Sequence, residues 1–117
     1  MKDKTIRVVP YRRAKAAWNL ALEEALYIKS LEKLKEEGTF NPIVRLYSFS
    51  SPSVILGYRQ RISEIDYDYC LKNGVEVTMR KTGGGSVYLG KNDMQYTFIL
   101  PLRYTRDILF SINSQIV

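Results

Sequence analysis

The sequence predicts an α+β domain with a mixed or mainly antiparallel sheet packed against helices. Short runs rich in β-branched and aromatic residues recur along the chain, separated by Pro, Gly, Asn and Ser. One long segment, residues 14–37, has helical periodicity and is followed by Gly38, a common helix-ending residue. Because helical and strand-like segments are intermixed and short turns join most strands, the pattern favours α+β over regular βαβ alternation.

The N-terminal third predicts one strand and one long helix. Residues 5–10 have strand-like composition, and we expect Pro10 to end that strand. In the helix over residues 14–37, Trp18 and Leu22 lie on one side, whereas Tyr27 and Leu31 lie on nearly the opposite side. Apolar residues on both sides predict a helix sandwiched within the core.

Beyond the long helix, the sequence predicts further strands and a short helix. Residues 43–49 and 53–58 flank a Ser-Pro turn, a pattern that predicts an antiparallel hairpin. Ser63 and Asp66 mark the start of a short helix that ends at Asn73-Gly74. The remaining expected elements are strands at 75–80, 86–89 and 94–100, and a helix from Thr105 onward.

Length and composition limit the chemistry that the chain can perform. With 117 residues, of which 45% are hydrophobic and 26% charged, it suits one compact domain. No histidine is present, which excludes His-based triads and Cys/His zinc sites. The single cysteine, Cys70, excludes an internal disulfide and is expected to be a small buried residue. No signal peptide or membrane-spanning run is found, so a cytoplasmic location and no membrane partner are expected.

The formal net charge of +6 points to an anionic partner. The 18 Lys and Arg residues are scattered among 12 acidic ones and form no basic block, so nucleic-acid binding is a minor alternative. The nine tyrosines are better explained by packing than by base stacking. Lys91 is expected to be a solvated turn residue.

The most informative segment is the glycine triplet Gly83–Gly85, which lies between two strand-like runs. Each glycine costs roughly 0.5–1 kcal/mol relative to alanine in a regular element, so a triplet indicates positive φ or close approach of a ligand. Backbone N–H groups in such a loop can hold an anion, and Arg80 and Thr82 can add polar contacts. The alternative is a flexible hairpin connection.

A second glycine pattern, from Gly85 to Asn92, nearly matches the phosphate-binding spacing G-x4-G-K-[ST]. Asn92 replaces the hydroxyl that would bind magnesium, and strand-like residues follow where a helix is required. A phosphate-binding loop of this type is therefore rejected.

Three segments in order resemble the lipoate–protein ligase A family, within the wider biotin/lipoate ligase and octanoyltransferase superfamily. RKTGGGSVYLGKNDMQYTFIL resembles its Arg-Arg-x-x-Gly-Gly-Gly segment, residues 16–26 resemble its N-terminal helix motif, and residues 43–60 resemble its strand pair. The resemblance covers most of the chain. It implies that residues 1–117 form the N-terminal part of a ligase-like catalytic domain with that superfamily's fold.

The resemblance also implies an activity and a site. Members of the family activate lipoate with ATP to lipoyl-AMP and transfer the acyl group to a lysine of an acceptor domain, whereas some relatives transfer octanoyl or lipoyl groups. Mg²⁺ is expected to accompany ATP, with no protein metal site. Arg80 matches the second arginine, near the adenylate phosphate, and Thr82 lies beside the acyl chain. The complete expected binding set is Arg80, Thr82, Gly83, Gly84, Gly85, Ser86, Val87 and Tyr88.

The sequence departs from the family at several positions. Met79 replaces the first arginine, Leu89 and Gly90 replace a His-Asp pair, and Asn92-Asp93 replaces a Gly-Asn pair. The family's ligase lysine and the transferases' cysteine have no counterpart in this chain, so no catalytic residue is assigned to it. We expect a complementary chain or homodimer and a lipoyl-acceptor protein as partners. The alternatives are a non-catalytic or split relative that binds nucleotide or acyl-adenylate, and an octanoyl or lipoyl transferase.

Overall fold

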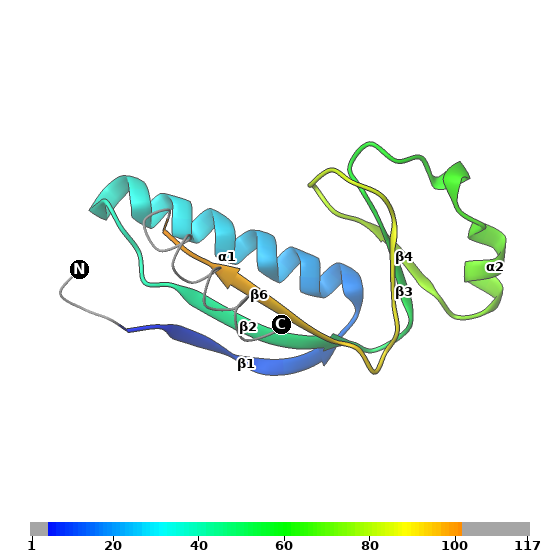
Figure 1. The fold of residues 1–117 in the computed structure, drawn as a ribbon, viewed down its shortest axis with the longest axis horizontal. Helices are drawn as coiled ribbons and strands as arrows, with labels where there is room; N and C mark the ends of the chain where they lie inside the picture. Colours follow the sequence, from blue (N-terminus) through cyan, green and yellow to red (C-terminus); the bar gives the residue numbers. More distant parts are fainter. Residues whose placement is uncertain (1–4, 102–117) are drawn as a thin grey trace, which may run out of the picture.

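The computed structural model describes residues 5–101, which form two three-stranded sheets and their helices (Figure 1). The predicted α+β class with mixed sheets is confirmed. The expected helix from Thr105 lies outside the described residues. The elements are β1 Arg7–Ala14, α1 Ala16–Glu37, β2 Ile43–Phe49, β3 Ser53–Leu56, the 3-10 helix η1 Ile62–Glu64, α2 Tyr67–Lys72, β4 Glu76–Met79, β5 Val87–Leu89 and β6 Met94–Ile99.

Both sheets combine parallel and antiparallel pairs. In the first, β2 lies between a parallel β1 and an antiparallel β6. In the second, β3 lies between a parallel β4 and an antiparallel β5. α1 runs along one face of the first sheet, and α2 lies at the far end of the second sheet (Figure 1).

The predicted hairpin of residues 43–49 and 53–58 is wrong, because β2 and β3 belong to different sheets. The two ends of the turn between them are hydrogen-bonded to different sheets. Ser50 donates its backbone N–H to the Ala14 carbonyl of β1 at 2.9 Å, and the Pro52 carbonyl accepts from Glu76 of β4 at 2.8 Å. The Ser-Pro turn therefore carries the chain from one sheet to the other.

The first strand runs past Pro10 instead of ending there. Proline cannot donate to a neighbouring strand, but β1 is an edge strand with one unpaired side. The pairing with β2 also shifts register between Val9 and Arg12, which is the kind of irregularity that accommodates proline.

The long helix α1 matches the predicted position but not the predicted burial. Gly38 ends it with φ of 78°, donating its N–H to the Leu34 carbonyl at 2.9 Å. Trp18, Tyr27 and Leu31 remain exposed, so α1 is not sandwiched within the core of residues 5–101. It packs by one face only, and its fully covered residues are Ala16, Asn19 and Ser30.

Two apolar clusters fill the space beneath α1. One joins Ala16 to Tyr47, Phe49 and Ile55, which connects the helix start to both sheets. The other gathers Phe40, Ile43 and Ile99 at the opposite end of the first sheet. Alternation along β2 places its odd-numbered residues toward the helix.

The predicted short helix consists of two parts, η1 and α2. Asp66, expected inside the helix, is instead the N-cap of α2, where it accepts from the Tyr69 N–H at 3.0 Å. Cys70 is buried, as predicted. Within residues 5–101, no helix has the length and apolar character required to cross a bilayer.

Glu76 of β4 connects the second sheet to the start of α1. Its carboxylate accepts from the Ala16 N–H at 2.7 Å and from the Ala17 N–H at 3.3 Å. Lys15, at the N-cap, makes no side-chain hydrogen bond to the helix. Glu76 therefore caps the helix N-terminus from a distant strand. Its negative charge also interacts favourably with the positive end of the helix dipole.

We expect Glu76→Ala to lower the free energy of unfolding by about 1–2 kcal/mol, because two helix amides lose their acceptor. Urea denaturation followed by circular dichroism measures the change. Glu36→Ala, at an exposed position of α1, is the control and should change stability by less than about 0.5 kcal/mol. Equal effects of the two substitutions would contradict the capping role.

Candidate functional site

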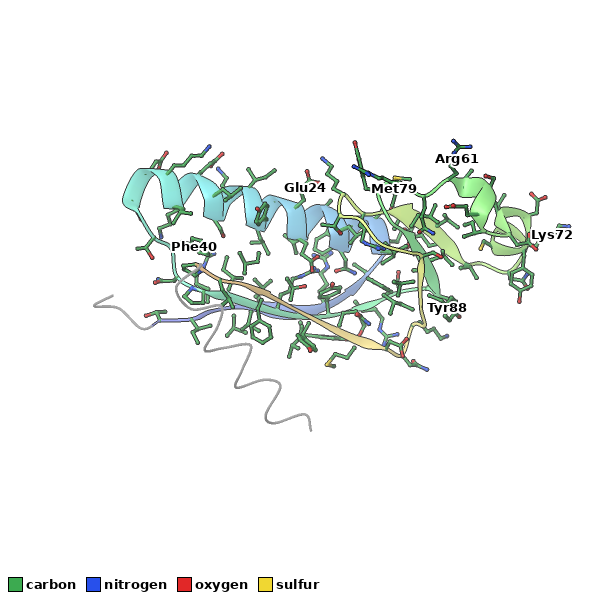
Figure 2. All side chains as sticks on the ribbon, turned by 45° about the horizontal axis from the view of Figure 1, so that its top comes forward. Glu24, Phe40, Arg61, Lys72, Met79 and Tyr88 are labelled. Atoms are coloured by element: carbon green, nitrogen blue, oxygen red, sulfur yellow. The ribbon has the colours of Figure 1, made fainter. Side chains whose placement is uncertain are left out.

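A groove of about 720 Å³ runs between α1 and the strands beside it. Its helix wall carries small and apolar side chains, and its opposite wall comes from the end of β4, the following loop and β6. Figure 2 shows Glu24 of α1 near this loop. The lining residues are Ala17, Leu20, Ala21, Glu23, Glu24, Tyr27, Ile28, Thr78, Met79, Arg80, Lys81, Thr82, Thr97, Phe98 and Ile99.

A buried polar network underlies one part of the groove. The Arg45 side chain is only 2% exposed and donates to the Asn19 carbonyl at 3.2 Å and to the Asn19 side-chain oxygen. Its guanidinium also lies 4.0 Å from the Tyr47 ring centroid and 3.8 Å from Glu23 Oε1. Because a buried charge needs partners, this arginine fixes α1 in position over β2.

Glu23 connects this network to the groove, which it lines together with Thr97. Its Oε1 accepts a hydrogen bond from Tyr47 Oη at 2.9 Å and another from the Thr97 hydroxyl. Burial raises the pKa of Tyr47, and burial lowers the pKa of Arg45 against the opposing effects of Tyr47 and Glu23. The two hydrogen bonds to Oε1 hold the Glu23 carboxylate in a fixed position at the groove surface.

The glycine loop is held in shape by Arg80. Its Nη2 donates to the carbonyls of Gly83 and Gly85, both at 2.8 Å, while Nη1 donates to Ile55 of β3 at 3.2 Å. Gly84, with φ of 100°, adopts a conformation that favours glycine. The Arg80 guanidinium therefore stabilises the conformation of the glycine loop.

A second glycine permits the loop to lie against β3. A Cβ at Gly57 would come within 2.0 Å of the Gly84 carbonyl oxygen, a backbone atom. The adjacent Tyr58 N–H donates to the Thr82 carbonyl at 2.8 Å. This contact explains why the turn after β3 requires glycine: the two loops touch through their main chains.

The expected binding residues fall into three groups. Arg80 and Thr82 line the groove. Gly83–Gly85 continue beyond it and are absent from its lining. Ser86 to Tyr88 lead into β5, where Val87 and Tyr88 pair with β3 and have exposed side chains. Among residues 5–101, no group of three or more Cys, Asp or Glu side chains is arranged to hold a metal ion.

The sequence analysis did not identify the helix side of the site. Glu23 and Glu24 are neighbours whose carboxylates diverge, yet both line the groove and each has a different partner. Arg45 was also missed. Its signal is a charged residue at an inward-facing position of the otherwise largely apolar strand β2.

Lys81 and Glu24 form an ion pair between the glycine loop and α1. Lys81 Nζ lies 2.6 Å from Glu24 Oε1, with side chains 77% and 41% exposed. The hydrogen bond to Glu24 raises the pKa of Lys81. An exposed pair of this kind adds little to stability, so its interest lies in its position on the groove.

Gly57→Ala should displace the glycine loop, because its Cβ meets backbone that cannot move aside alone. We expect a loss of about 1–3 kcal/mol in the free energy of unfolding and altered amide chemical shifts across residues 82–85. Gly83→Ala is the matched control, since its Cβ meets nothing within 4 Å. If both variants behave alike, the contact between the loops does not control the loop's shape.

Comparison with known proteins finds relatives that match most of the chain. A family model described as the lipoyl protein ligase A/B catalytic domain matches residues 15–116. An octanoyltransferase LipM from Carboxydothermus hydrogenoformans is 32% identical over 103 residues, covering 87% of this chain and 36% of the relative. Lipoate-protein ligase A subunit 1 from Thermoplasma acidophilum is 38% identical over 82 residues, covering 69% and 29% respectively.

The fold leads to the same group. A crystal structure of a lipoate-protein ligase A bound with ATP superposes with a TM-score of 0.68 at 33% identity, covering 79% of this chain and 35% of that one. The chain thus spans about a third of the length of the proteins that it matches. The family match over most of the sequence and the shared fold show that this chain belongs to the lipoyl protein ligase A/B catalytic-domain family.

Proposed function

We propose that the chain forms the acyl-binding part of an enzyme that attaches lipoyl groups to a lysine of an acceptor protein. The groove beside α1 is the observation that carries the proposal. Its volume of about 720 Å³ lies within the usual range for small-molecule sites, and Leu20, Ala21 and Ile28 provide apolar surface for an acyl chain. The glycine loop adjoins the groove, where an activated head group would lie.

The residues expected from sequence take the following roles in this proposal. Thr82 contacts the acyl chain, and the main chain of Gly83–Gly85 approaches the adenylate. Ser86, Val87 and Tyr88 form the nucleotide side. Arg80, expected from the sequence near the adenylate phosphate, contributes by fixing the shape of the loop through its hydrogen bonds to the Gly83 and Gly85 carbonyls.

ATP-dependent ligation through lipoyl-AMP is the reaction that we propose, with ATP and lipoate as substrates and Mg²⁺ accompanying ATP. The relatives named lipoate-protein ligase A support it. Octanoyl transfer without ATP is the second candidate, supported by the octanoyltransferase relative at 32% identity. Adenylation needs a cation directed at the reacting phosphate, and we assign that group to the complementary part of the enzyme.

A complementary chain is supported by the outer face of the first sheet. Val8, Leu46, Met94 and Tyr96 are all exposed there, on strands whose opposite face is packed under α1. Apolar surface of this kind favours association with another protein surface. The Thermoplasma relative is itself named a subunit, which supports an arrangement of more than one chain.

The proposal is tested by filling the groove. Ala21→Phe places a large side chain on the groove wall at an exposed helix position, and we expect at least tenfold weaker binding of a stable lipoyl-adenylate analogue. The cost to stability should stay near 0.5 kcal/mol, the difference in helix propensity. Isothermal titration calorimetry measures the affinity.

Ala25→Phe is the matched control, because Ala25 is exposed on the same helix but does not line the groove. It should bind the analogue like the parent chain. Equal affinities for the parent and Ala21→Phe would place the ligand elsewhere. Absence of binding to the parent would overturn the proposed function itself.

A further inference from the structure

Within residues 5–101, two basic side chains, Arg80 and Lys81, line the groove, and they differ in the groups that they already contact. Arg80 donates to three backbone carbonyls, those of Ile55, Gly83 and Gly85. If its guanidinium turned toward a ligand, these carbonyls would lose their donor and the glycine loop its support. Arg80 is therefore committed to the loop.

Lys81 is the other basic residue, and it is differently placed. Its side chain is 77% exposed at the groove, and its contact with Glu24 uses one carboxylate oxygen at 2.6 Å. An ammonium group carries three N–H donors, so Lys81 can bind a second anionic oxygen without leaving Glu24. The helix carboxylate holds the ammonium at the groove.

The surroundings of this ion pair suit an amphipathic acid. Leu20, Ala21 and Ile28 supply apolar surface along α1, while the Lys81–Glu24 pair places charge at the groove. Burying a carboxylate is costly unless a cation accompanies it. Glu24 alone would repel such a ligand, which makes the lysine the element that permits binding.

We propose that Lys81 binds the carboxylate of the acyl substrate, with Glu24 holding the lysine in place. The inference rests on the proposed function, because it assumes an acyl chain in the groove. Lys81 is thus a specificity-determining residue that distinguishes a free acid from a neutral analogue of the same length. The Lys81 ammonium is a compact point charge on a flexible stem and can adjust to the ligand carboxylate, whereas the Arg80 guanidinium is occupied by backbone carbonyls.

The two members of the pair should have opposite effects on acid binding. Lys81→Met removes the cation but keeps an apolar chain of similar length, and we expect about tenfold weaker octanoate binding. Glu24→Gln keeps an amide oxygen that accepts from Lys81 but removes a negative charge near the ligand carboxylate, so octanoate should bind several-fold more tightly. A purely structural ion pair would instead give the same direction of change in both variants.

The experiment is a calorimetric titration of the full chain at low salt with octanoate and, in parallel, with octanamide. Lys91→Met, in the turn before β6, is the matched control and should bind both ligands like the parent. Octanamide affinity should be unchanged in Lys81→Met and Glu24→Gln. Unchanged octanoate binding in Lys81→Met, or the same direction of change in both pair variants, would overturn the inference alone. A parent chain that binds neither ligand would overturn the proposed function as well.

Discussion

The burial of Arg45 is the constraint on which the rest of this structure depends. A guanidinium that is 2% exposed must be surrounded by acceptors, and Asn19 and Glu23 of α1 supply them. Asn19 also donates to the Ala14 and Ser48 carbonyls, which ties the helix to β1 and β2. Apolar packing alone would let α1 slide along the sheet, whereas these contacts fix its axial position. Because α1 forms one wall of the groove, its fixed position also fixes that wall.

The second sheet is joined to this unit by charged groups at two places. Glu76 holds the helix start, and Lys81 reaches Glu24 further along α1. The groove is lined from Ala17 to Ile28 on the helix and from Thr78 to Thr82 on the facing segment. Arg80 and Gly57 then shape the loop that adjoins it. The site thus lies where the two sheets meet, and α1 contacts both of them.

Local signals in the sequence were enough to locate most elements and the glycine loop. Periodicity placed α1, and Gly38 marked its end, because both signals depend on nearby residues. The pairing of the strands could not be predicted in this way. Residues 43–49 and 53–58 have the pattern of a hairpin, but hydrogen bonds from the turn between them to Ala14 and Glu76 direct the two strands into different sheets. Arg80 was likewise identified from the sequence, but its guanidinium donates to carbonyls of its own loop, and Lys81 was not identified. Which partner a long side chain selects is decided by tertiary contacts that periodicity does not report.

The central claim is that the groove beside α1 holds the acyl chain, and amide chemical-shift mapping with lipoic acid tests it most directly. The predicted result is a set of saturable shifts at Leu20, Ile28, Thr82 and Thr97, which line the groove from three segments of the chain. Shifts confined to the exposed outer sheet face, at Val8, Leu46 and Met94, would contradict the claim and assign the ligand to that surface instead.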